Sequence, residues 1–312
     1  MKIENINISE YKKIICEKKI DLPIYMNPDA INFYENLEFI KICKGNNIIA
    51  LYAYPLYRTG TEQWVKRDYR FLPYSAPVFL YNTRTLERKK ICYEIYKYLF
   101  NKYNVVYMPL SPNFESITSI QSLGGFVEER ATNVIKHRID YETLSSKLRN
   151  HINHSKKFVN IKITKNFVDF KYENAIKGSQ VEKIKRTELA QFLIKSGKGV
   201  IINAFEKEIN IAGAIVIYDT KRAYLFHTWQ NKDTIRGTVP FIIIEAINWC
   251  FDNLSIETFD FEGSVIDSID DFFASFNTEI EMYPYIHYAK EQTDFINIIE
   301  RSINIVGRIR NE

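Results

Sequence analysis

A short strand that ends in a glycine–serine turn constrains the fold of this chain more than any other stretch. Residues 258–264 read Thr-Phe-Asp-Phe-Glu-Gly-Ser, so aromatic and acidic residues alternate. A period of two is typical of a strand with one buried face. Gly263 and Ser264 end this strand, and residues 265–276 are predicted to form a helix. Ligands of open α/β sheets bind beyond the carboxyl ends of strands, which makes this turn a candidate binding site.

Asp260 and Glu262 are the two carboxylates of this stretch. Strand alternation predicts that both side chains point to one face, opposite Phe259 and Phe261. A carboxylate beside a cleft can anchor an amine or take its proton, so both residues are candidate catalytic groups. The alternative is that they only face solvent or cap the following helix, for which Ser264 is a favoured N-cap residue.

The composition is that of a soluble globular protein with one large domain or two ordinary ones. The chain has 312 residues, of which 46% are apolar and 26% charged, and its net charge is +4. Its cysteines are far apart and form no C-x-x-C pair, which favours reduced thiols in a cytosolic protein over a disulfide or a metal site. The first residues lack the apolar core of a signal peptide, and no apolar run reaches the ~18 residues that cross a bilayer.

The first half is predicted to combine helices with a meander of strands. Its strongest signal is a hairpin, in which Lys44-Gly45-Asn46 joins two apolar strands. A long amphipathic helix follows, and then a strand, a short helix and a closing strand. The expected elements are helix 9–18, strand 22–26, helix 27–35, strands 37–44 and 47–57, helix 85–103, strand 104–109, helix 113–123 and strand 126–139.

The second half repeats this order. This repeat predicts an N-terminal domain over residues 1–140, a boundary near Asp140, and a C-terminal domain over 141–292. An amphipathic helix over 293–312 is expected to pack on the second domain or, alternatively, to rest on a membrane surface. The expected elements are helix 141–158, strand 159–164, helix 167–196, strands 199–206, 210–218 and 222–229, helix 238–251, strand 258–262, helix 265–276 and strand 280–288.

This order of elements resembles the GNAT acyltransferase fold, and two copies in one chain resemble the FemAB-like proteins. The resemblance is carried by the basic stretch 146–157, the segment 259–264 with the aromatic run 272–276, and the closing strand 283–288. It implies an α/β protein of two tandem GNAT-like domains, each a mixed, mostly antiparallel sheet flanked by helices. The first domain matches only by architecture and is expected to be degenerate. Asn277 departs from the Phe-Gly ending of the family segment.

The resemblance implies acyl transfer and leaves the donor open between an acyl-CoA and an aminoacyl-tRNA. GNAT enzymes hold the CoA pyrophosphate with a glycine loop ahead of the long helix, where backbone N–H groups meet the anion. In the matching loop of this chain, Arg236, Gly237 and Thr238 are candidate phosphate contacts. Thr234 and Val239 depart from the family pattern, which weakens an acetyl-CoA interpretation and favours aminoacyl transfer.

Four aromatic or imidazole side chains are further candidates. Tyr283 and Tyr285 on the last strand are predicted to reach the same cleft, where Tyr285 would assist at the leaving atom. Core packing is the alternative for both. His227 and Trp229 share one face of a strand and are predicted to line the acceptor groove, with a hydrogen-bonded wall residue as the alternative for His227.

We therefore expect an N-acyltransferase or aminoacyltransferase that acts on an amine of a sugar, a peptide or a cell-envelope precursor. No metal is expected, and a cytoplasmic location is favoured, with a peripheral position at the inner membrane face as the alternative. The basic helix, with Lys147, Arg149, Lys156 and Lys157, would steer a tRNA or simply form a solvated face. One rival is an acetyl-CoA-dependent N-acetyltransferase that uses the second domain. The other is a non-catalytic binding or scaffold protein with the same fold.

Overall fold

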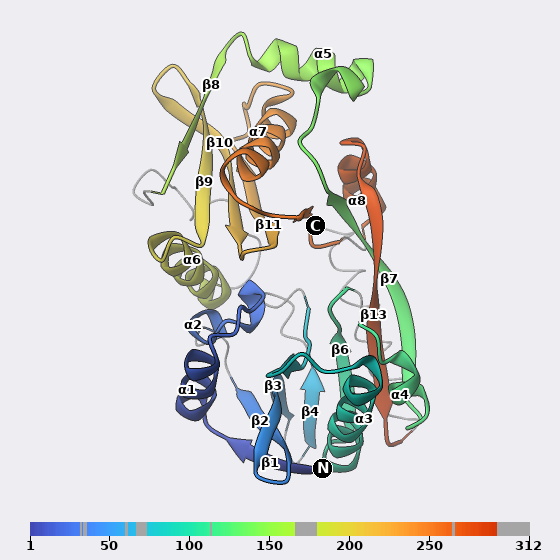
Figure 1. Ribbon diagram of the computed structural model, residues 1–312. Helices are drawn as coiled ribbons and strands as arrows, with labels where there is room; N and C mark the ends of the chain where they lie inside the picture. The colour runs from blue at the N-terminus through green and yellow to red at the C-terminus, as the bar shows by residue number, and fades with distance from the viewer. Residues whose placement is uncertain are drawn as a thin grey trace. The chain divides into compact units, whose positions relative to one another are not determined.

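The computed structural model describes residues 1–31, 33, 36–59, 62–66, 74–112, 114–165, 180–263 and 266–291 (Figure 1). These residues form two compact units. Unit 1 contains Met1–Ile20, Tyr34–Arg130 and the described residues from Met282 on, and unit 2 contains Asp21–Phe33 and Ala131–Glu281. Each unit combines a mixed sheet with helices, so the predicted α/β class is confirmed.

Unit 1 is built on a sheet with the strand order β1-β2-β3-β4-β6-β13-β7. β4 and β6 are parallel, whereas β6 and β13 are antiparallel. The apolar face of α3 covers the core of this unit, because Ile91, Ile95 and Leu99 recur at helical spacing and are fully buried. The elements are β1 (Lys2–Ile6), α1 (Ile8–Lys18), β2 (Leu37–Lys44), β3 (Asn47–Thr59), β4 (Glu62–Lys66), β5 (Val78–Phe79), α3 (Thr85–Lys102), β6 (Val105–Pro109) and α4 (Ile117–Gln121).

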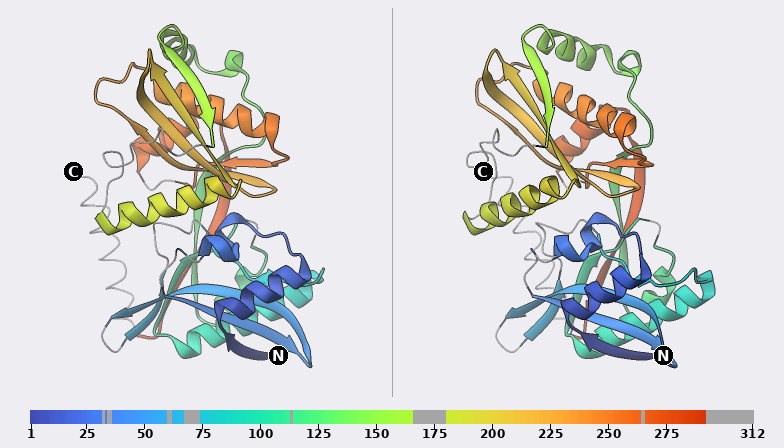
Figure 2. Two further views of the ribbon diagram at one scale, coloured as in Figure 1. Left: turned by 90° about the vertical axis from the view of Figure 1, so that its left-hand side faces the viewer. Right: turned by 60° about the vertical axis from the view of Figure 1, so that its left-hand side comes forward.

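Unit 2 is built on a sheet with the strand order β7-β12-β11-β10-β9-β8. Both faces of β9 and β10 are buried, and Figure 2 shows α6 and α7 on opposite sides of these strands. The near-continuous apolar sequence of α7 fits this burial. The elements are η1 (Ile24–Met26), α2 (Pro28–Ile31), η2 (Tyr141–Thr143), α5 (Ser146–Ser155), β8 (Val159–Thr164), α6 (Gln180–Lys195), β9 (Gly199–Glu206), β10 (Ile209–Tyr218), β11 (Arg222–Gln230), α7 (Thr238–Asn253), β12 (Thr258–Asp260) and α8 (Asp267–Ala274).

The two halves of the chain exchange their last strands. β7 (Phe126–Ile135) closes the first half, yet its residues Val134 and Ile135 pair with β12 in unit 2. β13 (Glu279–Ala289) closes the second half, yet it pairs with β6 in unit 1. A division at Asp140 therefore does not follow the compact units, which change at Ala131 and again at Met282. Element order along the chain did not reveal this exchange, because pairing partners are not written in a strand's own sequence.

β11 and β12 form the parallel pair of unit 2, and they stay together only briefly. Arg222, Ala223 and Tyr224 pair with Thr258, Phe259 and Asp260. β11 then continues to Gln230, whereas β12 ends at Asp260. The parallel pairing of β11 with β12 therefore stops at the carboxyl end of β12. The space beyond the carboxyl ends of strands is where α/β sheets bind ligands.

Several predicted elements differ in detail. A 3₁₀ helix, Ile24–Met26, replaces the strand predicted over 22–26, because the flanking Pro23 and Pro28 interrupt strand pairing. The first helix begins at Ile8, one residue earlier than predicted, because Asn7 caps it by accepting a hydrogen bond from the Glu10 N–H. The predicted helix over 293–312 and the first part of the helix over 167–196 lie outside the described residues. Among the helices that the structure describes, none is both long and apolar enough to cross a membrane.

Candidate functional site

The carboxyl end of β12 is held by the two strands that flank it in the sheet of unit 2, β11 and β7. Phe259 is fully buried between β11 and β7, and the Phe261 N–H donates to the Asn133 carbonyl at 3.1 Å. Phe259 and Phe261 contact each other edge to face, with ring centroids 5.5 Å apart. These aromatic residues anchor the strand, as the alternating pattern predicts, and fix the acidic residues between and after them.

Asp260 is fully buried, and its carboxylate is saturated with donors. Oδ1 accepts from Thr132 Oγ1 and from the Glu262 N–H, both at 2.7 Å. Oδ2 accepts from Arg222 Nε at 2.8 Å. A buried carboxylate that accepts this many hydrogen bonds is fixed in position. This geometry fits a positioning residue rather than the predicted catalytic base.

Arg222 is the counter-ion of Asp260 and links it to a second carboxylate. Its guanidinium also forms an ion pair with Glu281. Burial would lower the pKa of Arg222, but the charges of Asp260 and Glu281 outweigh it and raise that pKa further. The guanidinium is therefore permanently charged, and its neutralisation depends on these two acids.

Glu262 and Gly263 turn the chain sharply after the strand. Both have left-handed backbones, with φ of 64° and 67°. This conformation is natural for glycine and costs a residue with a side chain about 1 kcal/mol or more. A Cβ at Gly263 would also lie 3.0 Å from the Ala131 carbonyl oxygen. The hydrogen bond to Asp260 fixes the strained Glu262 in place, and strain of this kind concentrates at functional sites.

The segment after the turn is tied to β7. Asn133, fully buried, donates from Nδ2 to Asp270 Oδ1 at 2.6 Å and accepts from Thr278 Oγ1 at 2.5 Å. Asp270 lies on α8, so this amide holds that helix beside the turn. Ser264, predicted to contact a ligand or cap this helix, lies outside the described residues.

The start of α7 is covered by the basic helix α5. A Cβ at Gly237, whose φ is 93°, would lie 2.1 Å from the His151 carbonyl oxygen of α5. Thr238 is fully buried, with its hydroxyl 3.0 Å from that of Ser155 and its N–H donating to Ile235. The close approach of α5 to Gly237 and the burial of Thr238 disfavour phosphate contacts at these two residues, and such contacts stay a prediction.

The same helix start offers few donors. A pyrophosphate cradle needs several free backbone N–H groups at a helix N-terminus. Here the Thr238 N–H already donates to the Ile235 carbonyl, and Pro240 has no N–H. Arg236 lies in the loop ahead of α7, near His151. Desolvation and the charge of Arg236 lower the pKa of His151.

We expect acetyl-CoA to bind with a Kd weaker than ~100 µM. The physical reason is the covered and donor-poor N-terminus of α7, which leaves the pyrophosphate without its usual partners. Calorimetry with acetyl-CoA and the full chain measures this directly. Low-micromolar binding would contradict the inference and would favour an acetyl-CoA-dependent N-acetyltransferase.

His227 and Trp229 lie on β11 in largely buried positions. Burial, with a contribution from Arg186, lowers the pKa of His227 to about 4, so the imidazole is neutral at pH 7. Trp229 packs over Gly213, where a Cβ would lie 2.0 Å from the indole ring. Both side chains thus have packing contacts in unit 2, and their role in an acceptor groove stays a prediction.

Tyr283 and Tyr285 belong to unit 1, whereas Asp260 and Glu262 belong to unit 2. Tyr283 contacts the Tyr74 ring edge to face, with centroids 5.1 Å apart. Tyr285 is fully buried, and the Arg130 guanidinium lies 3.9 Å from the centroid of its ring. The structure therefore gives both tyrosines packing roles, and a catalytic role for Tyr285 stays a prediction.

A histidine–glutamate pair lies next to Tyr285 in unit 1. His287 Nε2 is 2.7 Å from Glu128 Oε2, and Arg130 contacts the same oxygen at 2.9 Å. Burial lowers the pKa of His287 although Glu128 opposes it, so the neutral ring donates Nε2–H to the carboxylate. Burial would raise the pKa of Glu128, but Arg130 and His287 outweigh it and lower that pKa.

Comparisons with known proteins identify this architecture. No family model matches the sequence, and no curated protein matches it. FemX matches with a TM-score of 0.62 at 9% identity, over 96% of this chain and 100% of that chain. The chain has a FemAB/GNAT-like fold. A tandem GNAT protein from the clavulanic acid biosynthesis pathway also matches, with a TM-score of 0.50 at 7% identity over 92% of this chain and 98% of its own.

A third solved structure also matches over nearly the whole of both chains. The C-terminal DUF2156 domain of a putative lysylphosphatidylglycerol synthetase from Agrobacterium fabrum matches with a TM-score of 0.58 at 10% identity. It covers 95% of this chain and 97% of that one. The predicted organisation as two tandem GNAT-like domains is confirmed by these matches.

Sequence reasoning missed the residues that hold the site. Thr132 and Arg222 bind Asp260 from other strands, and Glu128 meets His287 although they are 159 residues apart. No local pattern marks such long-range partners. The alternation over 258–262 gave no signal for them, because an acid between two aromatic residues of a strand can equally face solvent.

Proposed function

We propose that this protein transfers an aminoacyl or acyl group to an amine of a sugar, a peptide or a cell-envelope precursor, with an aminoacyl ester as the donor. The choice of donor rests on the N-terminus of α7, which α5 covers: the backbone of Gly237 lies against the His151 carbonyl. This feature disfavours a CoA pyrophosphate. The name of the Agrobacterium fabrum protein, a putative lysylphosphatidylglycerol synthetase, points to an aminoacyl product made on a related fold.

Glu262 is the proposed proton acceptor or amine anchor. The acceptor amine attacks the ester carbonyl, a C–N bond forms, and the C–O bond to the donor breaks. The amine loses a proton to Glu262, and the protonated Glu262 then gives a proton to the leaving alkoxide, so charge and protons balance. Asp260 contributes by holding the Glu262 backbone through a 2.7 Å hydrogen bond.

An aminoacyl-tRNA is the proposed source of the ester, and α5 is its proposed electrostatic contact. Arg149 is already paired with Glu142, and the Lys156 ammonium lies 3.4 Å from the centroid of the Tyr141 ring. Lys147 lies on this helix and Lys157 in the turn that follows it, and both side chains are exposed. These two lysines are therefore the cations that we assign to phosphate contacts.

The test is Glu262→Gln, which removes the charge and keeps the shape. We expect transfer to fall 10²-fold or more if Glu262 is a general base, and less if it only orients the amine. The free energy of unfolding should change by no more than about 0.5 kcal/mol. Mass spectrometry of acceptor amines after incubation with a charged tRNA pool measures transfer, and thermal melting measures stability.

Two further variants control this test. Glu208→Gln removes an exposed carboxylate from the β9–β10 turn and should leave transfer unchanged. Glu262→Gly removes the left-handed strain, so it should keep or raise stability by about 1 kcal/mol while transfer is lost. Early melting of Glu262→Gln with normal transfer would show that the carboxylate is structural.

A further inference from the structure

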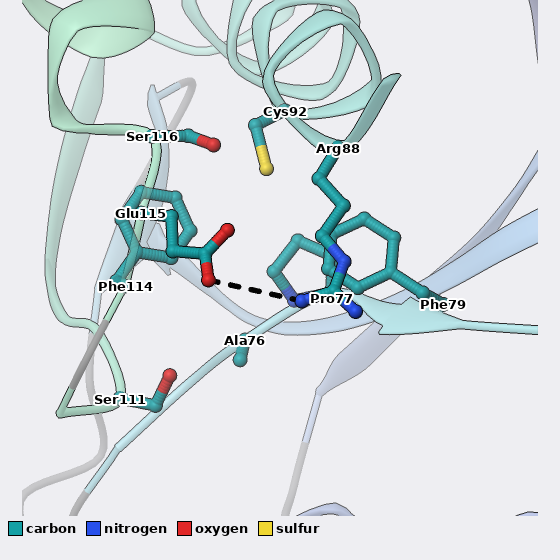
Figure 3. Close-up of a pocket in the computed structure, with 9 residues that line it drawn as sticks. All are labelled: Ala76, Pro77, Phe79, Arg88, Cys92, Ser111, Phe114, Glu115 and Ser116. Carbon is teal, nitrogen blue, oxygen red and sulfur yellow. Dashed lines mark ion pairs between the residues drawn. The ribbon is translucent and has the colours of Figure 1, made fainter. Parts of the chain in front are cut away.

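A small pocket in unit 1 lies between the start of α3 and the segment that leads into α4 (Figure 3). Its volume is about 170 Å³. That is smaller than the pockets of roughly 300–1,000 Å³ that hold drug-sized ligands. The pocket therefore suits a small ligand and excludes a nucleotide or a CoA. It is lined by Ala76, Pro77, Phe79, Arg88, Cys92, Ser111, Phe114, Glu115 and Ser116.

Opposite charges face each other in this pocket. Figure 3 shows the Arg88 guanidinium and the Glu115 carboxylate pointing toward one another, and their closest atoms are 3.9 Å apart. This distance is about 1 Å longer than a normal charge-assisted hydrogen bond. The two side chains are 35% and 48% exposed, so their mutual attraction is weak. A ligand with its own two charges can separate them at little cost.

Arg88 and the helix that follows Glu115 are held in place by neighbouring residues. Arg88 donates from Nε to Thr83 Oγ1 at 3.2 Å, and its guanidinium carbon lies 5.4 Å from the centroid of the Phe79 ring. The hydroxyl of Ser119 on α4 donates to the Lys89 carbonyl on α3 at 3.2 Å. The helix that carries Arg88 is thus tied to the helix that follows Glu115, and the pocket is organised before any ligand binds.

The rest of the lining is apolar or neutral. Phe79 and Phe114 supply aromatic walls, and Ala76 and Pro77 supply aliphatic ones. Cys92 is 1% exposed, and burial raises the pKa of its thiol to about 11, so it is a neutral lining group and not a thiolate. A third charge on a ligand would find no partner among these lining residues.

We propose that this pocket binds a small zwitterion of the α-amino-acid type with an apolar side chain. The ligand carboxylate binds Arg88, the ammonium binds Glu115, and the side chain packs against Phe79 and Phe114. This site is independent of the transfer reaction assigned to Glu262, which belongs to the other unit.

The test is calorimetry of the full chain with L-valine, N-acetyl-L-valine and L-valinamide. The N-acetyl compound lacks the ammonium, and the amide lacks the carboxylate. We expect L-valine to bind with a Kd of about 1 mM or tighter, and each analogue to bind at least 10-fold more weakly. L-Lysine and L-glutamate should also bind at least 10-fold more weakly than L-valine. Absence of L-valine binding at 10-fold that concentration, or equal binding of the three compounds, would overturn the proposal.

Two variants assign the charges separately. Glu115→Gln should abolish the preference for L-valine over its N-acetyl derivative and keep the preference over the amide. Arg88→Gln should do the reverse. Lys90→Gln removes an exposed charge from the same helix outside the pocket and should change neither ratio. A general structural effect would weaken all compounds alike, so a loss of both preferences in either variant would contradict the assignment.

Discussion

Cutting the chain at Asp140 is expected to give two fragments that do not fold when they are made separately. Fragment 141–312 loses the strand residues that pair with β12 in unit 2, where Val134 pairs with Asp260 and Ile135 with Phe259. Fragment 1–140 loses β13, whose residues 285–289 pair with β6 in unit 1. Each fragment therefore lacks a strand that completes its own sheet.

The size of the effect follows from the buried residues that are removed. Val134, Ile135 and Ile139 are 0%, 2% and 7% exposed. Burial of such side chains contributes about 1.5–3 kcal/mol each, or roughly 5–9 kcal/mol together. A domain of this size is stable by only about 5–15 kcal/mol. Asn248 of α7 also loses both of its hydrogen bonds to the Ile139 backbone.

Circular dichroism and thermal melting of each purified fragment measure this result. Co-expression is the matched control, because each fragment carries the strand that the other lacks. We expect the co-expressed fragments to co-purify as a folded pair. Cooperative melting of either fragment alone would show that the exchanged strand is dispensable.

Elements with strong local signals could be predicted from the sequence. The hairpin of β2 and β3 has the predicted turn, with Gly45 at φ 59°, and α7 begins at Thr238 as predicted. In both cases the deciding interactions are local: a glycine that accepts a left-handed backbone, and a proline tolerated in the first turn of a helix. Local chemistry of this kind is written in the sequence.

Features that depend on distant partners could not be predicted. β1 was missed because Lys2–Ile6 is a strand only through its pairing with β2. The covering of the α7 N-terminus depends on α5, so the sequence around Gly237 could not show that its backbone lies against the His151 carbonyl. The alternation over 258–262 correctly placed both carboxylates near one turn, but it could not show that Arg222 neutralises Asp260.

The difference between the two carboxylates has a physical basis. Asp260 still belongs to β12 and points into the sheet, where Thr132 and Arg222 meet it. Glu262 lies beyond the last paired residue, and its left-handed backbone turns it out of the strand pattern. Strict alternation therefore fails after Phe261. Asp260 therefore acts as a structural anchor, and Glu262 lies beyond the carboxyl end of β12.

Asp260→Asn is expected to lower the free energy of unfolding by about 3–5 kcal/mol, the cost of breaking a buried ion pair. The asparagine can keep the two hydrogen bonds that reach Oδ1, but its amide N–H₂ would face the guanidinium of Arg222, where two donors repel. Arg222, 15% exposed, would keep only Glu281 as a counter-ion. Urea unfolding of the variant and the wild type measures this difference.

Asp252→Asn is the matched control for that measurement. Asp252 pairs with Arg138 at 3.4 Å, but both side chains are about half exposed or more, at 48% and 63%. The same substitution there should cost no more than about 1 kcal/mol, because water screens the pair. An Asp260→Asn variant within about 1 kcal/mol of the wild type would show that Glu281 alone neutralises Arg222. In that case Asp260 would hold Glu262 through Oδ1 only, and the buried charge would contribute nothing to the turn that presents the proposed base.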